Sequence, residues 1–248
     1  MTIWIALDLI LAKAATSELT IEPPSHEDLE AAVQDPDEAL LGLAAEGDRV
    51  DFIFQAKTRS TSPWSSADLA KVLTGEQDEE DIKGRGRKKP LEMLMADLRR
   101  RYVFITNEAL TESLRANEAQ HFFDFPEATE LPPYARESYD APAQAALAPR
   151  ILLCGGVTEE VLGARIDRLL SRHGHVPSVN HLACLKDLRD EVRKRIRGHA
   201  AGRWTRSELV GCLLGMAARW LRPGRWITMS VHALLTTYER SWTGRMRC

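Results

Sequence analysis

The spacing of apolar residues changes from one segment of the chain to the next, and each spacing predicts a different element. Short apolar runs bounded by turn residues predict strands within residues 18–24, 51–57, 102–106 and 150–156. Helical spacing predicts helices within residues 3–15, 65–73, 91–101, 107–120 and 185–198, with two more that begin at residues 158 and 205. Strands that alternate with helices over this length predict an α/β fold with a central sheet covered by helices.

Two helix starts carry capping signals. Ser65 or Ser66 precedes the helix after the second strand, and an N-cap serine satisfies a backbone N–H of the first turn. Thr205 and Glu208 form a capping box ahead of the last helix. These residues predict where the two helices begin.

Two stretches predict connections instead of regular elements. Residues 121–149 contain five prolines and several aromatic residues, which predict an irregular connection. Residues 75–90 are rich in charge and glycine, and we expect a mobile loop there. The last third of the chain is helical and basic. We therefore divide the chain into a main domain over residues 1–175 and a small helical region over residues 176–248.

Composition places the chain among ordinary globular proteins. It has 248 residues, 44% of them hydrophobic and 28% charged. Four widely separated cysteines argue against a disulfide framework or a thiolate zinc site and favour a reducing cytoplasm. The apolar residues 3–12 include Asp8, are too short to cross a membrane and lack the basic flank of a signal peptide, so we expect no membrane contact.

The net charge of −3 conceals an asymmetry along the chain. Residues 1–50 carry eleven acidic side chains against two basic ones, a balance of −9. From Lys186 to the end there are fourteen basic side chains against five acidic ones, a balance of +9. The acidic end is suited to cations and the basic end to polyanions.

Polar side chains end the strand "DFIFQAK". Alternation along a strand puts Gln55 and Lys57 on one face, and burying either without a partner costs about 1–3 kcal/mol. Three carboxylates come earlier, with Glu22 at the end of the first strand and Glu27 and Asp28 in the turn after it. If these two strands pair, carboxylate and amide oxygens converge with a lysine. That combination predicts a Mg²⁺ site.

These residues resemble a known nuclease superfamily. The turn "SHED", with Asp28, and "FQAKTR", with Gln55 and Lys57, resemble PD-(D/E)xK nucleases in the variant whose last acidic residue is glutamine. The resemblance implies a restriction endonuclease-like fold with a central mixed sheet. The run "VDFIFQAKTRSTSPWSSADLAKVL" and "RYVFITNEAL" also look like N-terminal nuclease domains of some bacterial antiphage defence proteins. The match covers residues 16–120, and only Asp8 is available for the acidic or glutamine residue that such domains usually carry on a preceding helix.

The resemblance implies a Mg²⁺-dependent endonuclease of double-stranded DNA in an antiphage or restriction system, with Mn²⁺ able to replace Mg²⁺. Asp28 and Gln55 would bind the metal, with Glu22 and Glu27 as further ligands. Lys57 would orient the attacking water or neutralise charge on the phosphate. We also expect a homo-oligomer or attachment to a larger sensor protein.

Basic residues outside this site predict the contacts with DNA phosphates. The predicted DNA-binding residues are Arg59, Arg193, Lys194, Arg197, Arg203 and Arg206. The glycine-rich basic run 83–90 could also contact phosphates, or it could be a solvated linker.

Other interpretations stay open. A Q-x-K triplet arises readily by chance, so Gln55 and Lys57 could be solvated residues at a sheet edge. An inactive DNA-binding or protein-docking module on the same fold is the alternative function. The close residues His173, His175 and His181 lack a familiar ligand spacing, so loop histidines are favoured over a zinc site.

Overall fold

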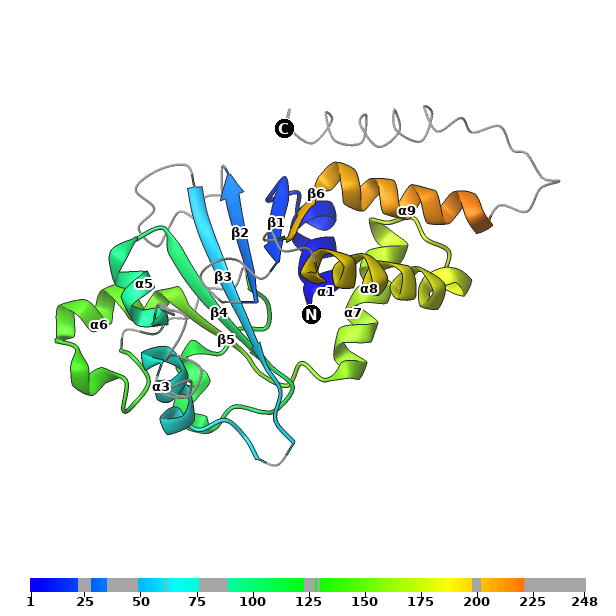
Figure 1. Ribbon diagram of the computed structural model, residues 1–248. Coiled ribbons are helices and arrows are strands. Elements are labelled where there is room, and N and C mark those ends of the chain that lie inside the picture. The colour runs from blue at the N-terminus through cyan, green and yellow to red at the C-terminus, as the bar shows by residue number, and fades with distance from the viewer. Residues whose placement is uncertain are drawn as a thin grey trace.

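A six-stranded mixed sheet runs through the molecule, with helices on both faces (Figure 1). The computed structural model describes residues 1–21, 28–34, 49–60, 62–75, 89–122, 128, 130–197 and 202–220. The strands are β1 Glu18–Ile21, β2 Leu29–Gln34, β3 Arg49–Lys57, β4 Arg100–Thr106, β5 Ile151–Cys154 and β6 Gly202–Thr205. The predicted α/β class, with a central mixed sheet flanked by helices, is confirmed.

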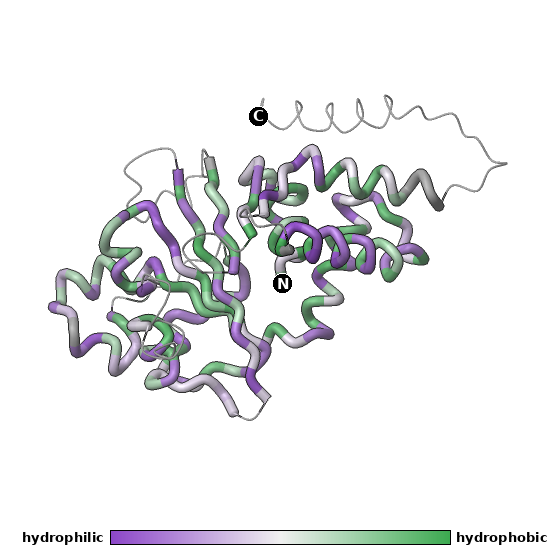
Figure 2. Tube along the Cα trace, in the orientation of Figure 1, coloured by the Kyte–Doolittle hydropathy of each residue, from purple (hydrophilic) through white to green (hydrophobic). Residues whose placement is uncertain are grey.

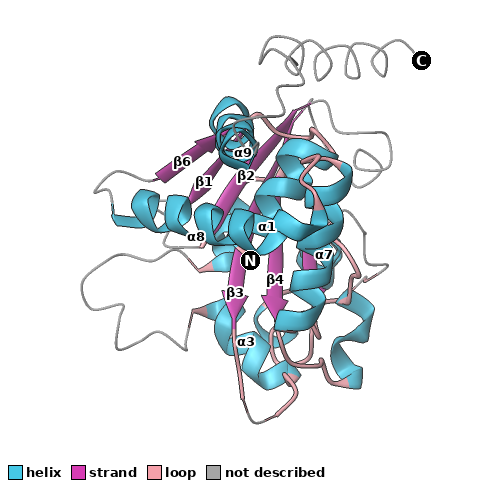
Figure 3. Cartoon of the chain, turned by 90° about the vertical axis from the view of Figure 1, so that its right-hand side faces the viewer, coloured by secondary structure: helices cyan, strands magenta, loops and turns pink. Residues whose placement is uncertain are grey.

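The helices cover the sheet in two groups. They are α1 Thr2–Ala6, which continues as a π-helix over Leu7–Ala12, α3 Ser66–Thr74, α5 Pro90–Ala96, α6 Ala141–Leu147, α7 Glu159–Arg172, α8 His181–Arg197 and α9 Arg206–Trp220. Figure 1 shows α3, α5 and α6 on one side of the sheet and α1, α7 and α8 on the other, and Figure 3 shows α1, α7 and α8 in front of the strands. Ser65 caps α3 and Thr205 with Glu208 caps α9, as predicted.

The strand order β5-β4-β3-β2-β1-β6 joins an antiparallel half to a parallel half. Strands β6, β1, β2 and β3 pair antiparallel, whereas β3, β4 and β5 pair parallel. Lys57 and Thr106 are register partners, so β3 and β4 end side by side. Because β2 begins where β3 ends, three strands bring their termini to one edge of the sheet.

Each face of the sheet has its own hydrophobic core, visible as green tube segments inside both helical layers (Figure 2). Phe52 and Phe54 of β3 point into the core beneath α1, α7, α8 and α9. Ile53 points into the opposite core, together with Tyr102 and Phe104 of β4 and the apolar residues of α3 and α5. The alternation predicted for β3 is therefore present, and Gln55 and Lys57 belong to the face of Ile53.

Strand β2 was not predicted, and its presence corrects the expected pairing. Its sequence, "LEAAVQ", is rich in helix-forming residues, but Leu29, Ala31 and Val33 alternate as buried positions along a strand. Sheet packing has overridden the local preference. The strand that contains Gln55 and Lys57 therefore pairs with β2, and β2 separates it from β1.

Three predicted boundaries differ from the structure. The helix expected over residues 91–101 ends at Ala96, because β4 begins at Arg100. The helix expected over residues 107–120 is a 3₁₀ turn over Glu112–Asn117, because Trp64 pairs with the backbone on both sides of Leu110. The connection expected over residues 121–149 contains a helix, α6. Its one proline, Pro142, lies in the first turn, where a missing N–H costs no helical hydrogen bond.

The C-terminal region takes part in the same sheet. Strand β6, also not predicted, pairs with β1, and Trp204 is fully buried in the core of α1. The sheet thus contains strands from both sides of the boundary that we drew between residues 175 and 176. The division into two regions stays a prediction. Residues 76–88, which make up most of the loop expected to be mobile, lie outside the described residues.

Candidate functional site

The structure brings Asp28 next to the end of β3. Leu29, the residue after Asp28, pairs with Phe54 at the last register position of the antiparallel β2–β3 ladder. The Asp28 N–H also donates to the Phe54 carbonyl, at 3.1 Å, so Asp28 is bonded to β3 one residue before β2 begins. The Asp28 Oδ2 atom accepts the N–H of Ala56 at 2.5 Å. Asp28 therefore holds the peptide group between Gln55 and Ala56, one residue before Lys57.

Gln55 is buried, with 4% of its surface exposed, and it has a partner in the core. Its Oε1 atom accepts a hydrogen bond from the hydroxyl of Tyr102, which is fully buried on β4. This bond explains how the core beneath α3 and α5 accommodates a polar side chain, because a buried amide is costly without a partner. A carbonyl oxygen has two lone pairs, so the bond to Tyr102 uses half of its acceptor capacity.

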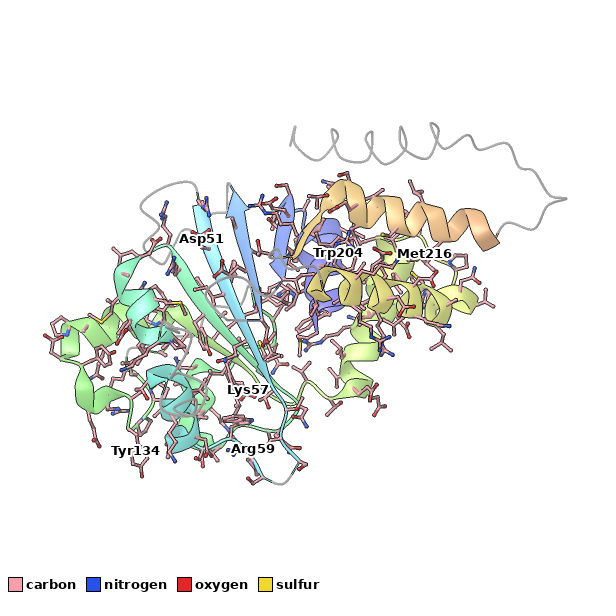
Figure 4. All side chains as sticks on the ribbon, viewed as in Figure 1. Asp51, Lys57, Arg59, Tyr134, Trp204 and Met216 are labelled. Carbon is pink, nitrogen blue, oxygen red and sulfur yellow. The ribbon has the colours of Figure 1, made fainter. Side chains whose placement is uncertain are left out.

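Lys57 lies at the last position of β3, half-buried. Figure 4 shows Lys57 and Arg59 at the same end of this strand, with Asp51 at the other end. Asp28, Gln55 and Lys57 thus lie at one edge of the sheet. Their predicted catalytic and metal-binding roles stay predictions.

Arg59, predicted to bind DNA, is engaged within the protein. Its Nη1 atom lies 2.9 Å from the Asp68 carboxylate, and its guanidinium lies 4.2 Å from the centre of the Trp64 ring. The hydrogen bond from Arg59, followed by one from Ser65, holds the pKa of Asp68 well below its usual range. The same bond to Asp68 raises the pKa of Arg59. This arginine therefore braces the connection between β3 and α3.

Three polar residues that the sequence analysis did not single out tie the ends of β3 and β4 together. Asn107 bonds to both the N–H and the carbonyl of Arg59, at 2.9 and 2.7 Å. The Trp64 indole donates to the hydroxyl of Thr106 at 2.8 Å. The position of Asn107 directly after a buried strand was the available signal in the sequence.

The buried carboxylate of Asp8 has a partner of its own. Asp8 lies in the π-helix that follows α1, with 5% of its surface exposed. The Nε2 atom of His121 contacts its Oδ2 atom. His121 also packs against Phe122 and Trp4, which belong to the core beneath α1. Asp8 thus faces the side of the sheet opposite to Gln55.

Two of the predicted DNA-binding residues project from α8. The side chains of Arg193 and Lys194 are 66% and 71% exposed. Arg193 pairs with Asp190 at 3.1 Å, and Lys194 pairs with Glu191 at 2.6 Å. Surface pairs within one helix are weak, so both cations can exchange these partners for phosphates.

The other predicted DNA-binding residues lie around β6 and α9. Arg203 is 70% exposed on β6 and lies 4.0 Å from Glu18 of β1. Arg206 begins α9, where its backbone N–H donates to the carbonyl of Ser17. Arg197 ends α8, and its side chain is outside the described part of the structure. Contact of these residues with DNA stays a prediction.

Among the described residues, no group of three or more histidine, cysteine, aspartate or glutamate side chains is placed to hold a metal ion. Glu22 and Glu27, predicted as further metal ligands, lie outside the described residues. Oxygen donors for a hard cation are nevertheless present, in the carboxylate of Asp28 and the amide of Gln55. Mg²⁺ takes oxygen donors of this kind, and together the two side chains carry a single negative charge.

The histidines after α7 do not form a metal site in the described structure. His181 lies between Asp167, at 3.0 Å from its Nδ1 atom, and Ser171, at 3.3 Å from its Nε2 atom. These are the residue types of a catalytic triad. The Nε2 atom also lies 3.0 Å from the Val176 carbonyl, which can only accept, so Nε2 donates there and is not a base for Ser171.

No protein-family model matches the chain, and no curated protein matches it. Among solved structures, it is similar to the Cap4 SAVED/CARF-domain containing receptor of Moraxella osloensis, at 15% identity and a TM-score of 0.45, over 88% of this chain and 46% of that one. It is also similar to the Cap4 receptor of Acinetobacter baumannii with the cyclic trinucleotide 2'3'3'-cAAA, at 8% identity and a TM-score of 0.44, over 88% of this chain and 44% of that one. The chain thus spans less than half the length of these receptors. TM-scores below 0.5 decide neither the fold nor the function.

In the described part of the chain, no helix combines the length and the hydrophobicity needed to span a bilayer.

Proposed function

We propose that this chain is a metal-dependent DNA endonuclease domain that hydrolyses phosphodiester bonds in double-stranded DNA. The observation that carries the proposal is the hydrogen bond from the Ala56 N–H to the Asp28 carboxylate, which puts Asp28 beside the end of β3 that carries Gln55 and Lys57. These are the residues of the Q-x-K resemblance. Gln55 and Lys57 lie on β3, and Asp28 directly precedes β2, a strand that the sequence analysis did not predict.

Asp28 and Gln55 would hold Mg²⁺, because both offer oxygen ligands. The Asp28 carboxylate accepts the Ala56 N–H through Oδ2, so it would have to hold the ion while keeping this bond. When bound, Mg²⁺ would supply positive charge that stabilises the phosphate and acidifies water. Since glutamine is neutral, we expect weaker metal binding than at a site with two carboxylates, and a stronger dependence on bound DNA.

Lys57 would supply the second positive charge of the site. It follows the peptide group that Asp28 holds, so its backbone is fixed at the edge of the sheet. An ammonium group there would orient the attacking water or neutralise charge that develops on the phosphate. Such a fixed charge acts most strongly in the transition state, and its removal typically lowers the rate by about 10²–10³.

The flanking DNA would be bound by basic residues away from this edge. Arg193, Lys194 and Arg203 are exposed, and they are the described members of the proposed set that also contains Arg197 and Arg206. We leave Arg59 out of this set, because its guanidinium is paired with Asp68.

We place this nuclease in antiphage defence because of its sequence resemblance. The same proposal includes a cytoplasmic location and either a homo-oligomer or attachment to a larger sensor protein.

One observation favours a second candidate, an inactive module on the same fold that binds DNA or docks a partner. The carbonyl of Gln55 is engaged by Tyr102 inside the core. Of the predicted metal ligands that the structure describes, Asp28 is the one that carries a charge. Titration with Mg²⁺ or Mn²⁺ in the presence of a short duplex separates the two candidates. The nuclease predicts metal uptake that is lost in Asp28→Ala, and the inactive module predicts no difference.

Plasmid cleavage tests the proposed function. The native protein, Asp28→Ala and Lys57→Ala are compared in Mg²⁺, with Lys71→Ala as a control at an exposed lysine of α3. We expect cleavage by the native protein and Lys71→Ala and its loss in the other two. Equal activity in all four proteins would remove the mechanism.

A further inference from the structure

The side chain of Asn107 binds the backbone of Arg59 with both of its polar atoms. Its Oδ1 atom accepts the Arg59 N–H at 2.9 Å, and its Nδ2 atom donates to the Arg59 carbonyl at 2.7 Å. An amide side chain has the same donor and acceptor as a peptide group. Asn107 therefore pairs with Arg59 as a neighbouring strand would.

This pairing continues the parallel β3–β4 ladder beyond its last register pair. Lys57 and Thr106 are the final partners in that ladder, and Arg59 lies two residues further along. Two residues is the spacing at which a parallel neighbour bonds to the same edge of a strand. The side chain of Asn107 thus replaces the backbone of a strand that has ended.

The backbone on the other side of Lys57 is also held by a side chain. The Asp28 carboxylate accepts the N–H of Ala56 at 2.5 Å, from the β2 side of the strand. Lys57 therefore lies between two peptide groups that are fixed from opposite directions, by Asp28 and by Asn107. A backbone held on both sides aims the first bonds of the lysine side chain.

The connection that follows Lys57 is braced at its far end as well. The guanidinium of Arg59 stacks on Trp64 and pairs with Asp68. The Trp64 indole in turn donates to Thr106, the register partner of Lys57. These contacts close a ring of interactions around the end of β3. Among these residues, Asn107 is the one whose side chain binds the backbone two residues after Lys57.

We propose that Asn107 is a positioning residue for Lys57, fixing the end of β3 so that the ammonium group points at the site formed with Asp28. This inference rests on the proposed function for the role of Lys57, but the clamp on Arg59 can be measured without it. Misplacement of a catalytic group by about 1 Å can cost about 10²-fold in rate, so a backbone clamp of this kind has a measurable effect.

Amide hydrogen exchange tests the clamp. In Asn107→Ala the Arg59 amide loses its acceptor, and we expect its exchange, together with that of Lys57, to become at least about tenfold faster. Asn117→Ala is the matched control, because Asn117 is a buried asparagine that donates to the carbonyls of Ala148 and Ile151. It should leave exchange at Lys57 and Arg59 unchanged. Unchanged exchange in Asn107→Ala would overturn the inference.

Single-turnover cleavage at saturating duplex and Mg²⁺ tests the link to Lys57. We expect Asn107→Ala to lower the rate by about 10–100-fold with duplex affinity within about twofold of the native protein. In the Lys57→Ala background the same substitution should cause no further loss, which a general structural defect would not reproduce.

The outcomes separate the two proposals. Native cleavage rates in Asn107→Ala, or losses that multiply in the double variant, would overturn the positioning role while leaving the nuclease intact. If the native protein cleaves no DNA in Mg²⁺ or Mn²⁺, the proposed function fails, and hydrogen exchange still decides whether Asn107 holds the end of β3.

Discussion

The Trp64 indole N–H donates to the hydroxyl of Thr106 at 2.8 Å in a buried environment, joining the loop after β3 to the end of β4. Thr106→Val keeps the shape of the side chain but removes this acceptor. A buried N–H left without a partner costs about 1–3 kcal/mol, so the free energy of unfolding should fall by that amount. Urea denaturation measures it, with Thr20→Val on β1 as a control. Equal denaturation midpoints for Thr106→Val and the native protein would contradict the importance of this bond.

The Arg59–Asp68 pair predicts a dependence of stability on pH. Because the pair lowers the pKa of Asp68 in the folded protein, its stabilisation is present above the unfolded pKa of about 4 and is lost as the pH falls below it. Asp68→Asn should lower the free energy of unfolding at pH 7 by about 1 kcal/mol, because it removes the charge that pairs with Arg59 while Ser65 stays as the N-cap. The difference from the native protein should shrink at pH 3. A difference that is the same at both pH values would contradict the role of the charge.

The thiol of Cys184 should resist alkylation in the folded protein. Burial, with smaller effects of Asp187 and Cys212, raises its pKa to about 12. At pH 8 the thiolate fraction is then on the order of 10⁻⁴, and the thiolate is the reactive form. Iodoacetamide labelling followed by peptide mass spectrometry should find Cys184 unmodified in buffer and modified in urea. Rapid labelling in buffer would show that the contact between α8 and α9 opens readily.

Much of the fold could be predicted because its hydrophobic pattern is local. The runs that form β3, β4 and β5 are apolar enough to indicate strands, and Ser65 and Thr205 are recognisable caps. Strand β2 could not be predicted, because "LEAAVQ" favours a helix until two neighbouring strands supply its hydrogen bonds. Strand β6 could not be predicted either, because its four residues are too few for a clear apolar pattern and its position is fixed by pairing with β1.

The residues of the candidate site could likewise be predicted only in part. Gln55 and Lys57 could be found because two polar residues end an apolar strand. The hydroxyl of Tyr102 and the amide of Asn107 could not be assigned as their neighbours, because both contacts depend on the pairing of β3 with β4. A sequence pattern shows which face of a strand a residue lies on, but not which strand lies beside it.

The basic residues of α8 predict a dependence of DNA affinity on salt. If Arg193 and Arg197 contact phosphates, replacing both with alanine should lower the log–log slope of affinity against salt by about 0.9 per contact. The effect should be similar for all duplex sequences, and cleavage at saturating DNA should survive. Lys71→Ala serves as the control for a basic side chain on the opposite helical layer. An unchanged slope in the double variant would mean that this end of α8 faces a protein instead of DNA.

The measurement that tests the central claim most directly is the Mg²⁺-dependent cleavage rate of Lys57→Ala relative to Lys71→Ala. Both variants lose one lysine, but Lys57 ends β3 next to the peptide group held by Asp28, whereas Lys71 is exposed on α3. We predict that Lys71→Ala cleaves a plasmid at the native rate and that Lys57→Ala is slower by about 10²–10³-fold. Equal rates for the two variants would contradict a nuclease site built on Asp28, Gln55 and Lys57.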